Sequence, residues 1–239
     1  MASARATGRD RQASLSDAEA VARHKRAAAR SAAELVQDGM RVGLGTGSTV
    51  AYLLEALGER SLAQARFAVT SPATEQAARA LGLTVAGLDE LGELDLAIDG
   101  ADQVDPRGWL IKGGGAAHTR EKIVAAAARE FVVIVSQEKL VSGLSPPVPL
   151  ELVPFAVQTT LAALGEARLR DVPMSPDGGL IADYLGSLDD DPRALASRLT
   201  AQPGVVEHGL FEPEMVSWIF SGGESGVQRR SGAKPPAPA

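Results

Sequence analysis

The sequence contains no cysteine, so the chain can form neither a disulfide bond nor a thiolate metal site. This composition is compatible with a reducing compartment, and the cytoplasm is the expected location. Long apolar runs are absent as well, and the first residues, MASARATGRDRQASL, include nothing like the apolar core of a signal peptide. We therefore expect no membrane association.

Positive charge and aromatic side chains are scarce. The 24 Lys and Arg residues are outnumbered by 30 Asp and Glu residues, which gives a net charge of -6. Without a broad positive field the chain is not expected to bind nucleic acid. Aromatic residues make up only 4% of the chain, whereas Ala and Gly are frequent, which favours helices packed closely on a sheet. A length of 239 residues is enough to bury a full core.

Short apolar segments alternate with amphipathic ones in the first part of the chain. We expect strands near residues 40–44, 67–69, 83–86, 94–98, 109–111 and 131–135, and helices over residues 50–57, 75–81 and 119–129. An earlier helix is expected to start at Ser16, which begins a capping-box spacing, and to run to Gly39, leaving residues 1–15 as a disordered leader. This alternation predicts an α/β fold with a mostly parallel sheet covered by helices on both faces.

A Pro-rich stretch at residues 145–149 interrupts the alternation and predicts a domain boundary. A smaller α+β domain is expected over residues 146–209, with helices over 157–164 and 192–201 and strands near 167–172, 180–184 and 205 onward. The apolar segment 215–220 is expected to return to the first sheet, so the larger domain would comprise residues 16–145 and 210–222. Residues 223–239, rich in Gly, Ser and Pro, are predicted to form a disordered tail.

A glycine-rich turn, Gly43 to Thr49, lies between a predicted strand and a predicted helix. Glycines let backbone N–H groups approach an anion, and the hydroxyls of Thr46, Ser48 and Thr49 add donors near a positive helix terminus. The alternative is a tight turn with a Ser or Thr helix cap. The turn lacks the third spaced glycine of the dinucleotide fingerprint and the lysine of a P-loop, so it favours a small phosphorylated ligand over NAD or ATP.

Two carboxylates, Asp99 and Asp102, directly follow the apolar run that ends at Ile98. Ligands bind at the carboxyl ends of strands in open parallel sheets, so both acids are placed for chemistry. Solvated acids in an Asx turn are one alternative. A divalent metal is another, because an acid recurs at Asp105. The three histidines are scattered, however, so only carboxylates support a metal, and hydrogen bonds to sugar hydroxyls are the favoured role.

Three successive glycines, Gly113 to Gly115, follow Lys112 and precede Glu121. Such a run costs backbone entropy in any fold, which suggests that something must come close to the main chain. A cation, a cradle of N–H groups and a carboxylate base are the parts needed to move a proton beside a carbonyl. Taken alone, Glu121 is better explained as an acid that stabilises the first turn of a helix. Lys139 adds a cation after a buried strand, although taken alone it is better explained as a solvated side chain.

Taken in order, GLGTGST, SPATEQ, DGADQVD, KGGGAAHTREKIVAAA, SQEKLV and PLELVPFA resemble the ribose-5-phosphate isomerase A family over most of residues 19–222. The resemblance implies a Rossmann-like α/β domain with a smaller, ferredoxin-like α+β domain. It also implies a homodimer or homotetramer that needs no metal or other cofactor. The implied activity interconverts D-ribose 5-phosphate and D-ribulose 5-phosphate through an enediolate, in the non-oxidative pentose phosphate pathway.

The same resemblance implies a set of site residues. Glu121 would be the base, and Asp99, Asp102 and Lys112 would take part in catalysis. The implied substrate-binding residues are Lys25, Thr46, Gly47, Ser48, Thr49, Asp99, Gly100, Ala101, Asp102, Lys112, Gly113, Gly114, Gly115 and Lys139. The sequence departs from the family pattern at Gln103, His118 and Glu138, none of which has a proposed chemical role.

Two other functions stay open on the residues alone. A deaminase of amino-sugar phosphates would use the same anion-binding turn with different acids, and release of ammonia from glucosamine 6-phosphate would reveal it. A regulatory domain that senses sugar phosphates would need no base and would normally carry a DNA-binding unit, for which the residues before Ser16 are too few.

Overall fold

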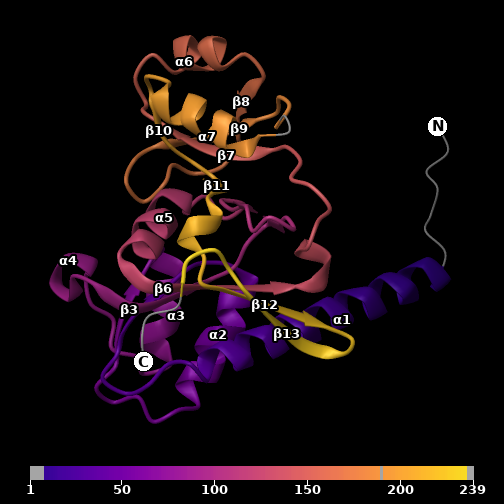
Figure 1. The fold of residues 1–239 in the computed structure, drawn as a ribbon, viewed down its shortest axis with the longest axis vertical. Coiled ribbons are helices and arrows are strands. Elements are labelled where there is room, and N and C mark those ends of the chain that lie inside the picture. Colours follow the sequence, from indigo (N-terminus) through magenta and orange to yellow (C-terminus); the bar gives the residue numbers. More distant parts are fainter. Residues whose placement is uncertain (1–7, 189–190, 236–239) are drawn as a thin grey trace.

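The computed structural model describes residues 8–188 and 191–235, and it is built on one large sheet and two smaller ones (Figure 1). The large sheet has the strand order β13-β12-β6-β3-β1-β2. Its strands are β1 (Arg41–Leu44), β2 (Arg66–Val69), β3 (Leu94–Asp99), β6 (Ala128–Ser136), β12 (Trp218–Gly223) and β13 (Gly226–Ser231). All neighbouring strands are parallel except β12 and β13, which pair antiparallel. The predicted α/β class with a mostly parallel sheet is thus confirmed.

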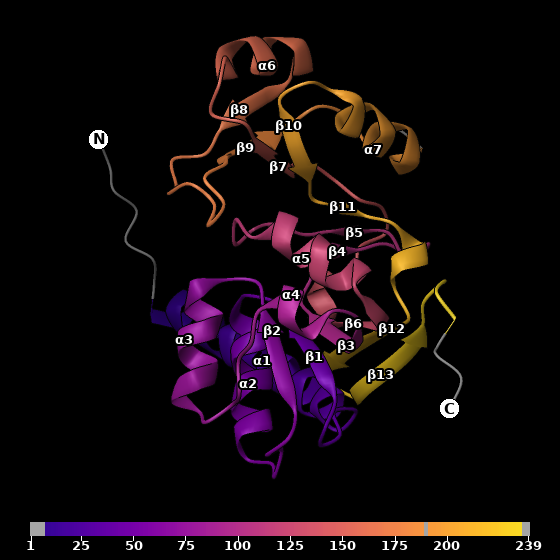
Figure 2. The same ribbon diagram turned by 90° about the vertical axis from the view of Figure 1, so that its left-hand side faces the viewer.

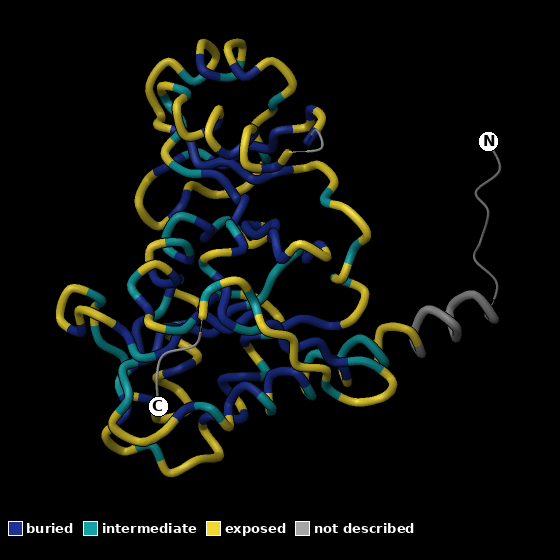
Figure 3. The backbone as a smooth tube through the Cα atoms, in the orientation of Figure 1, coloured by how far each residue is buried: buried dark blue, intermediate teal, exposed yellow. Residues whose placement is uncertain are grey.

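Helices cover both faces of the large sheet. They are α1 (Gly8–Ala33), α2 (Ser48–Gly58), α3 (Pro72–Ala80), α4 (Leu88–Leu91) and α5 (His118–Ala126). The apolar run of β6 is unbroken because successive side chains of a strand point to opposite faces, and both faces of this strand are covered. Val132 and Ile134 pack in the cluster with α1 and α2, whereas Val133 and Val135 pack in the cluster with α5. In Figure 3, the residues of the strands in the middle of the large sheet are coloured as buried.

The smaller domain contains a four-stranded antiparallel sheet of order β10-β7-β9-β8. Its elements are β7 (Val148–Leu152), α6 (Val157–Leu164), β8 (Ala167–Leu169), β9 (Leu180–Tyr184), α7 (Pro192–Ala201) and β10 (Val205–His208). The succession β7-α6-β8-β9-α7-β10 is the ferredoxin-like βαββαβ arrangement. Leu150, Leu152 and Leu199 belong to the core of this domain.

A short three-stranded sheet lies between the two larger ones (Figure 2). It consists of β4 (Gln103–Val104), β5 (Leu110–Ile111) and β11 (Leu210–Phe211). Two 3-10 turns, η1 (Gln137–Lys139) and η2 (Pro213–Met215), complete the elements. Among the described residues, no helix has both the length and the apolar character to cross a bilayer.

Both predicted disordered ends are partly wrong. Helix α1 begins at Gly8, inside the predicted leader, and residues 1–7 lie outside the described residues. In the predicted tail, β13 pairs with β12 over Gly226 to Ser231. The polar composition of this segment gave no sign of a strand. Strand β13 pairs with the outer edge of β12 and satisfies its backbone N–H and carbonyl groups. The hairpin between the two strands turns at Gly226, which has φ 100°. Residues 236–239 lie outside the described residues.

Several predicted boundaries also shift. Helix α1 ends at Ala33 instead of Gly39, and α5 ends at Ala126 because β6 already begins at Ala128. The predicted strand over residues 83–86 is reduced to a single bridge between Val85 and Phe67. Strand β7 begins at residue 148, within the Pro-rich stretch, and β8 ends at residue 169. Elements α4, β4 and β11 were not predicted, and each is at most four residues long.

Candidate active site

A cavity of about 130 Å³ lies where the carboxyl ends of β1 and β3 meet the glycine-rich segment before α5. Its lining consists of Lys25, Thr46, Gly47, Ser48, Thr49, Gly100, Ala101, Asp102, Lys112, Gly113, Gly114, Gly115, Glu121 and Lys139. These are all of the predicted site residues except Asp99. Two larger hollows, of about 880 and 890 Å³, contain neither Lys112 nor Glu121. The smaller cavity brings both of these side chains together with the two glycine-rich segments and is therefore the candidate active site.

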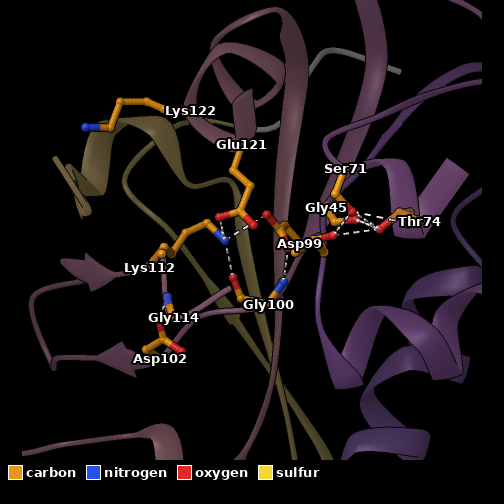
Figure 4. Close-up of polar contacts among 12 residues, drawn as sticks. Gly45, Ser71, Thr74, Asp99, Gly100, Asp102, Lys112, Gly114, Glu121 and Lys122 are labelled. Atoms are coloured by element: carbon orange, nitrogen blue, oxygen red, sulfur yellow. Dashed lines mark hydrogen bonds and ion pairs between the residues drawn. The ribbon is translucent and has the colours of Figure 1, made fainter. Parts of the chain in front are cut away.

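Three buried charged side chains meet at one wall of the cavity (Figure 4). Nζ of Lys112 donates to Oδ2 of Asp99 at 2.7 Å and to the carbonyl oxygen of Gly100 at 2.6 Å. The same Nζ lies 3.0 Å from Oε2 of Glu121. The side chains of Lys112, Asp99 and Glu121 are 3%, 5% and 4% exposed, so water screens none of these contacts. The ammonium group is therefore held between two carboxylates, with Asp99 behind it and Glu121 facing the cavity.

The buried cluster shifts the acidity of all three groups. Burial and the nearby Asp99 raise the pKa of Glu121 to about 7, although Lys112 opposes the shift. Burial also raises the pKa of Asp99 against the attraction of Lys112. Burial opposes the charge of Lys112, but the carboxylates of Asp99 and Glu121 outweigh it and raise the pKa of the ammonium group. Glu121 can therefore accept and release a proton near neutral pH, while Lys112 stays positively charged.

The turn between β1 and α2 forms another side of the cavity and contacts Asp99 of this cluster through the N–H of Thr46. A methyl group on Gly45 would overlap the carboxylate of Asp99, and Gly47 has φ 115°, so both positions require glycine. Helix α2 begins at Ser48 without a side-chain cap, which leaves the N–H groups of its first turn available to an anion. Lys25 of α1 donates from Nζ to Oγ of Ser48 at 2.9 Å and adds positive charge there.

A cluster of hydroxyl groups behind this turn was missed by sequence reasoning. Oγ1 of Thr46 contacts Oγ of Ser71 and lies 2.7 Å from Oγ1 of Thr74. Thr74 also donates from Oγ1 to the carbonyl oxygen of Gly45 at 3.1 Å, and its own N–H donates to Ser71 at 3.2 Å. The available signal was the Ser-x-x-Thr spacing in the SPATEQ segment, where Ser71 caps α3. The cluster fixes the side chain and backbone of the turn at Thr46.

Asp102 stands apart from the buried cluster and faces the cavity. Its Oδ2 accepts a hydrogen bond from the N–H of Gly114 at 2.8 Å, whereas Asp99 accepts from the N–H groups of Gly100 and Thr46 at 2.7 and 3.2 Å. Asp105 points elsewhere and accepts from the N–H of Trp109 at 2.9 Å. The three acids considered for a metal thus have separate partners. Within residues 8–188 and 191–235, no three His, Asp or Glu side chains are grouped as metal ligands would be.

His118 is buried beneath the glycine-rich segment and does not line the cavity. A methyl group on Gly113 would lie 2.7 Å from Nδ1 of His118, so the ring packs directly against the glycine backbone. Burial, aided by the charge of Lys122, lowers the pKa of His118 to about 4. The imidazole is therefore neutral at pH 7 and serves packing.

Comparisons with known proteins show which family the chain is similar to. The profile described as "Ribose 5-phosphate isomerase A (phosphoriboisomerase A)" matches residues 66–226. Ribose-5-phosphate isomerase A of Methanoregula boonei is 47% identical over 207 residues, which cover 81% of this chain and 87% of that protein. The crystal structure of ribose 5 phosphate isomerase A from Neisseria gonorrhoeae has a TM-score of 0.84 at 34% identity and covers 88% of this chain and 97% of its own. A D-ribose-5-phosphate isomerase in complex with phospho-erythronic acid also has a TM-score of 0.84, at 35% identity, with coverages of 88% and 99%.

Proposed function

Because the chain belongs to the ribose 5-phosphate isomerase A family, we propose that it interconverts D-ribose 5-phosphate and D-ribulose 5-phosphate with Glu121 as the base. The observation that carries the proposal is the buried contact of 3.0 Å between Glu121 and Lys112 at the wall of a cavity lined by two glycine-rich segments. A carboxylate with a pKa of about 7 next to a fixed cation is suited to moving a proton beside a carbonyl group.

The phosphate group binds at the start of α2. The N–H groups and hydroxyls of Ser48 and Thr49 are donors there, and the positive end of the helix favours an anion. Lys25 and Lys139 both line the cavity and supply positive charge. Anchoring the phosphate on this side leaves the C1–C2 end of the open-chain sugar to extend toward Glu121. This arrangement uses binding energy at a remote group to orient the reacting carbon.

The reaction proceeds through an enediolate. Glu121 removes the proton from C2 of the aldose, and the electron pair of that bond moves into a C1–C2 double bond while the carbonyl oxygen becomes negatively charged. Lys112 stabilises this oxygen, because its ammonium group is already fixed by Asp99 and does not have to reorganise. Glu121 then returns the proton to C1 as the C2 hydroxyl becomes the ketose carbonyl.

Asp99 and Asp102 have different roles in this mechanism. Asp99 is held behind Lys112 and accepts three hydrogen bonds, so it positions the cation instead of contacting the sugar. Asp102 lines the cavity, and one of its oxygens is engaged by Gly114. We assign to Asp102 the transfer of the hydroxyl proton between the two sugar oxygens and assistance in ring opening.

The experiment that tests this function adds ribose 5-phosphate to protein treated with EDTA and follows ketose formation. Formation of ribulose 5-phosphate without added metal supports both the reaction and its independence of a divalent cation. Glucosamine 6-phosphate is the comparison substrate, and ammonia release from it in place of ketose formation would replace the isomerase with a deaminase.

Two further features remain predictions from the family. A homodimer or homotetramer is expected, and sedimentation of the purified chain would measure its mass. A cytoplasmic location is expected as well, and fractionation of cells that produce the protein would test it.

A further inference from the structure

The smaller domain holds the segment that carries the proposed base. Between Lys112 and Lys122, this segment is contacted by side chains of the smaller domain, namely Glu151, Arg170, Asp177 and Glu207. In β7 and β9, alternate residues point to opposite faces, so Glu151 and Asp183 lie on the face away from the apolar core of their own sheet. That face is turned toward α5 and the glycine-rich segment (Figure 2).

Arg170 is the residue of this group that reaches the cavity wall. It follows β8, and its backbone N–H donates to the carbonyl oxygen of Ile181 at 2.9 Å, which ties it to β9. Its Nε and Nη2 both donate to Oδ1 of Asp183, at 2.9 and 2.5 Å. The two side chains are 16% and 11% exposed, so the ion pair is largely shielded from water. Because the guanidinium group is planar, this pairing fixes the direction of the remaining nitrogen, Nη1.

Nη1 of Arg170 donates to the carbonyl oxygen of Gly113 at 2.8 Å. That carbonyl and the N–H of Gly114 belong to the same peptide group, and a trans peptide directs them to opposite sides. The N–H of Gly114 is the donor that holds Oδ2 of Asp102 at 2.8 Å. The carbonyl end of the peptide is therefore held by the side chain of Arg170 and, at 3.1 Å, by the N–H of Ala116, and its N–H end holds Asp102.

We propose that Arg170 is a positioning residue for the isomerisation, because the peptide between Gly113 and Gly114 transmits its fixed geometry to the carboxylate of Asp102. The glycines make this support necessary, since Gly113 has φ 105° and neither residue has a side chain to restrict the backbone. Without Arg170 the carbonyl of Gly113 keeps only the turn hydrogen bond from the N–H of Ala116, so the peptide is held less firmly and the donor to Asp102 is less well fixed. The inference rests on the proposed function, in which Asp102 moves the hydroxyl proton.

Arg170→Met tests the proposal through kinetics of the full chain on ribose 5-phosphate. We expect kcat to fall by about 10- to 100-fold, because displacement of a reacting group by about 1 Å is enough for such a loss. The Michaelis constant changes much less, because the phosphate site at Ser48 is not touched. Arg170→Lys should recover only part of the rate, since a single ammonium group cannot pair with Asp183 and reach Gly113 in the same geometry.

A double-mutant cycle separates positioning from general stabilisation. If Arg170 acts through Asp102, then Arg170→Met together with Asp102→Asn should be little slower than Asp102→Asn alone. Losses that multiply would overturn the proposal. Arg193→Met is the matched control, because Arg193 of the smaller domain also pairs with two carboxylates, Glu212 and Glu214, but neither of them lies between residues 112 and 122. Asp183→Asn replaces Arg170→Met if the latter does not fold, with a smaller loss in the same direction.

Amide hydrogen exchange at Gly114 gives a readout that does not depend on activity. Arg170→Met should speed exchange of this amide, whereas Arg193→Met should leave it as in the wild type. If the wild type failed to convert ribose 5-phosphate, the proposed function would fall, yet this exchange measurement would still decide whether Arg170 orders the peptide. Equal exchange in all three proteins would contradict the proposal.

Discussion

Replacing Lys112 by methionine isolates the contribution of the buried cation. The methionine side chain is of similar length but carries no charge, so the two carboxylates around Nζ lose their shared partner. Lys112 is 3% exposed and lies 2.7 Å from Asp99 and 3.0 Å from Glu121, which makes this a buried ion cluster. Removing one member of a buried ion pair costs about 3–5 kcal/mol, because the remaining charge is left without water or a counterion. We expect a loss of this size in the free energy of unfolding near neutral pH.

The loss should depend on pH in a defined direction. The pKa values of Asp99 and Glu121 are already raised by burial with Lys112 present, and removing the cation raises both further. A carboxyl group whose pKa is higher in the folded than in the unfolded state stabilises the fold below its unfolded pKa, and this stabilisation is lost as pH rises toward the folded pKa. In the wild type, the stabilisation contributed by protonated Glu121 is lost by the time the pH reaches its folded-state pKa of about 7. In the variant, the free energy of unfolding continues to fall above that pH, by up to about 1.4 kcal/mol per pH unit for each carboxyl group.

Urea unfolding of the wild type and of Lys112→Met at acidic, neutral and alkaline pH measures this difference directly. The gap between the two free energies of unfolding should widen above neutral pH. Lys139→Met is the control, because Lys139 lines the same cavity but is only half-buried, and its removal should change stability by less than about 0.5 kcal/mol. A gap that is absent, or constant across pH, would refute the reasoning about buried charge.

Three further predictions concern the same site. The value of kcat/KM for ribose 5-phosphate should rise with pH through an apparent pKa of about 7, because Glu121 must be ionised to remove the proton, and a flat profile of initial rates would argue against it. Thr74→Val should raise the Michaelis constant by about 3- to 10-fold with little change in kcat, since the turn at the phosphate site loses its hydroxyl support, whereas Thr74→Ser should behave as the wild type. Gly45→Ala should abolish turnover, because its methyl group would overlap Asp99, while Gly87→Ala, where nothing lies within 4 Å of an added methyl group, should keep it.

Much of the large sheet could be predicted because its central strands carry unbroken apolar runs. The segment ending at Ile98 and the run from Phe131 to Val135 are buried on both faces, and only an internal parallel strand or a buried helix has that composition. Strand β13 could not be found in this way. It lies at the edge of the sheet, most of its residues are exposed, and its pairing depends on the neighbouring strand more than on its own composition.

The location of the candidate site could be predicted because parallel strands bring their carboxyl ends to one edge of the sheet. The direction of individual side chains could not. Asp99 and Asp102 are three residues apart, yet one is buried behind Lys112 and the other lines the cavity. The contacts of Thr74 with Thr46 and of Arg170 with Gly113 join segments 28 and 57 residues apart in the chain. Such contacts depend on packing between elements, which no local pattern records.

The assignment of Glu121 as the base is tested most directly by Glu121→Gln in deuterium oxide, with nuclear magnetic resonance used to follow ribose 5-phosphate. The glutamine keeps the size of the side chain but cannot accept the C2 proton. We predict that kcat falls by about 10²- to 10⁴-fold or more, that no deuterium enters the sugar at C1 or C2 on the wild-type timescale, and that substrate affinity is retained. Turnover near the wild-type rate, or deuterium exchange that persists in the variant, would contradict the assignment.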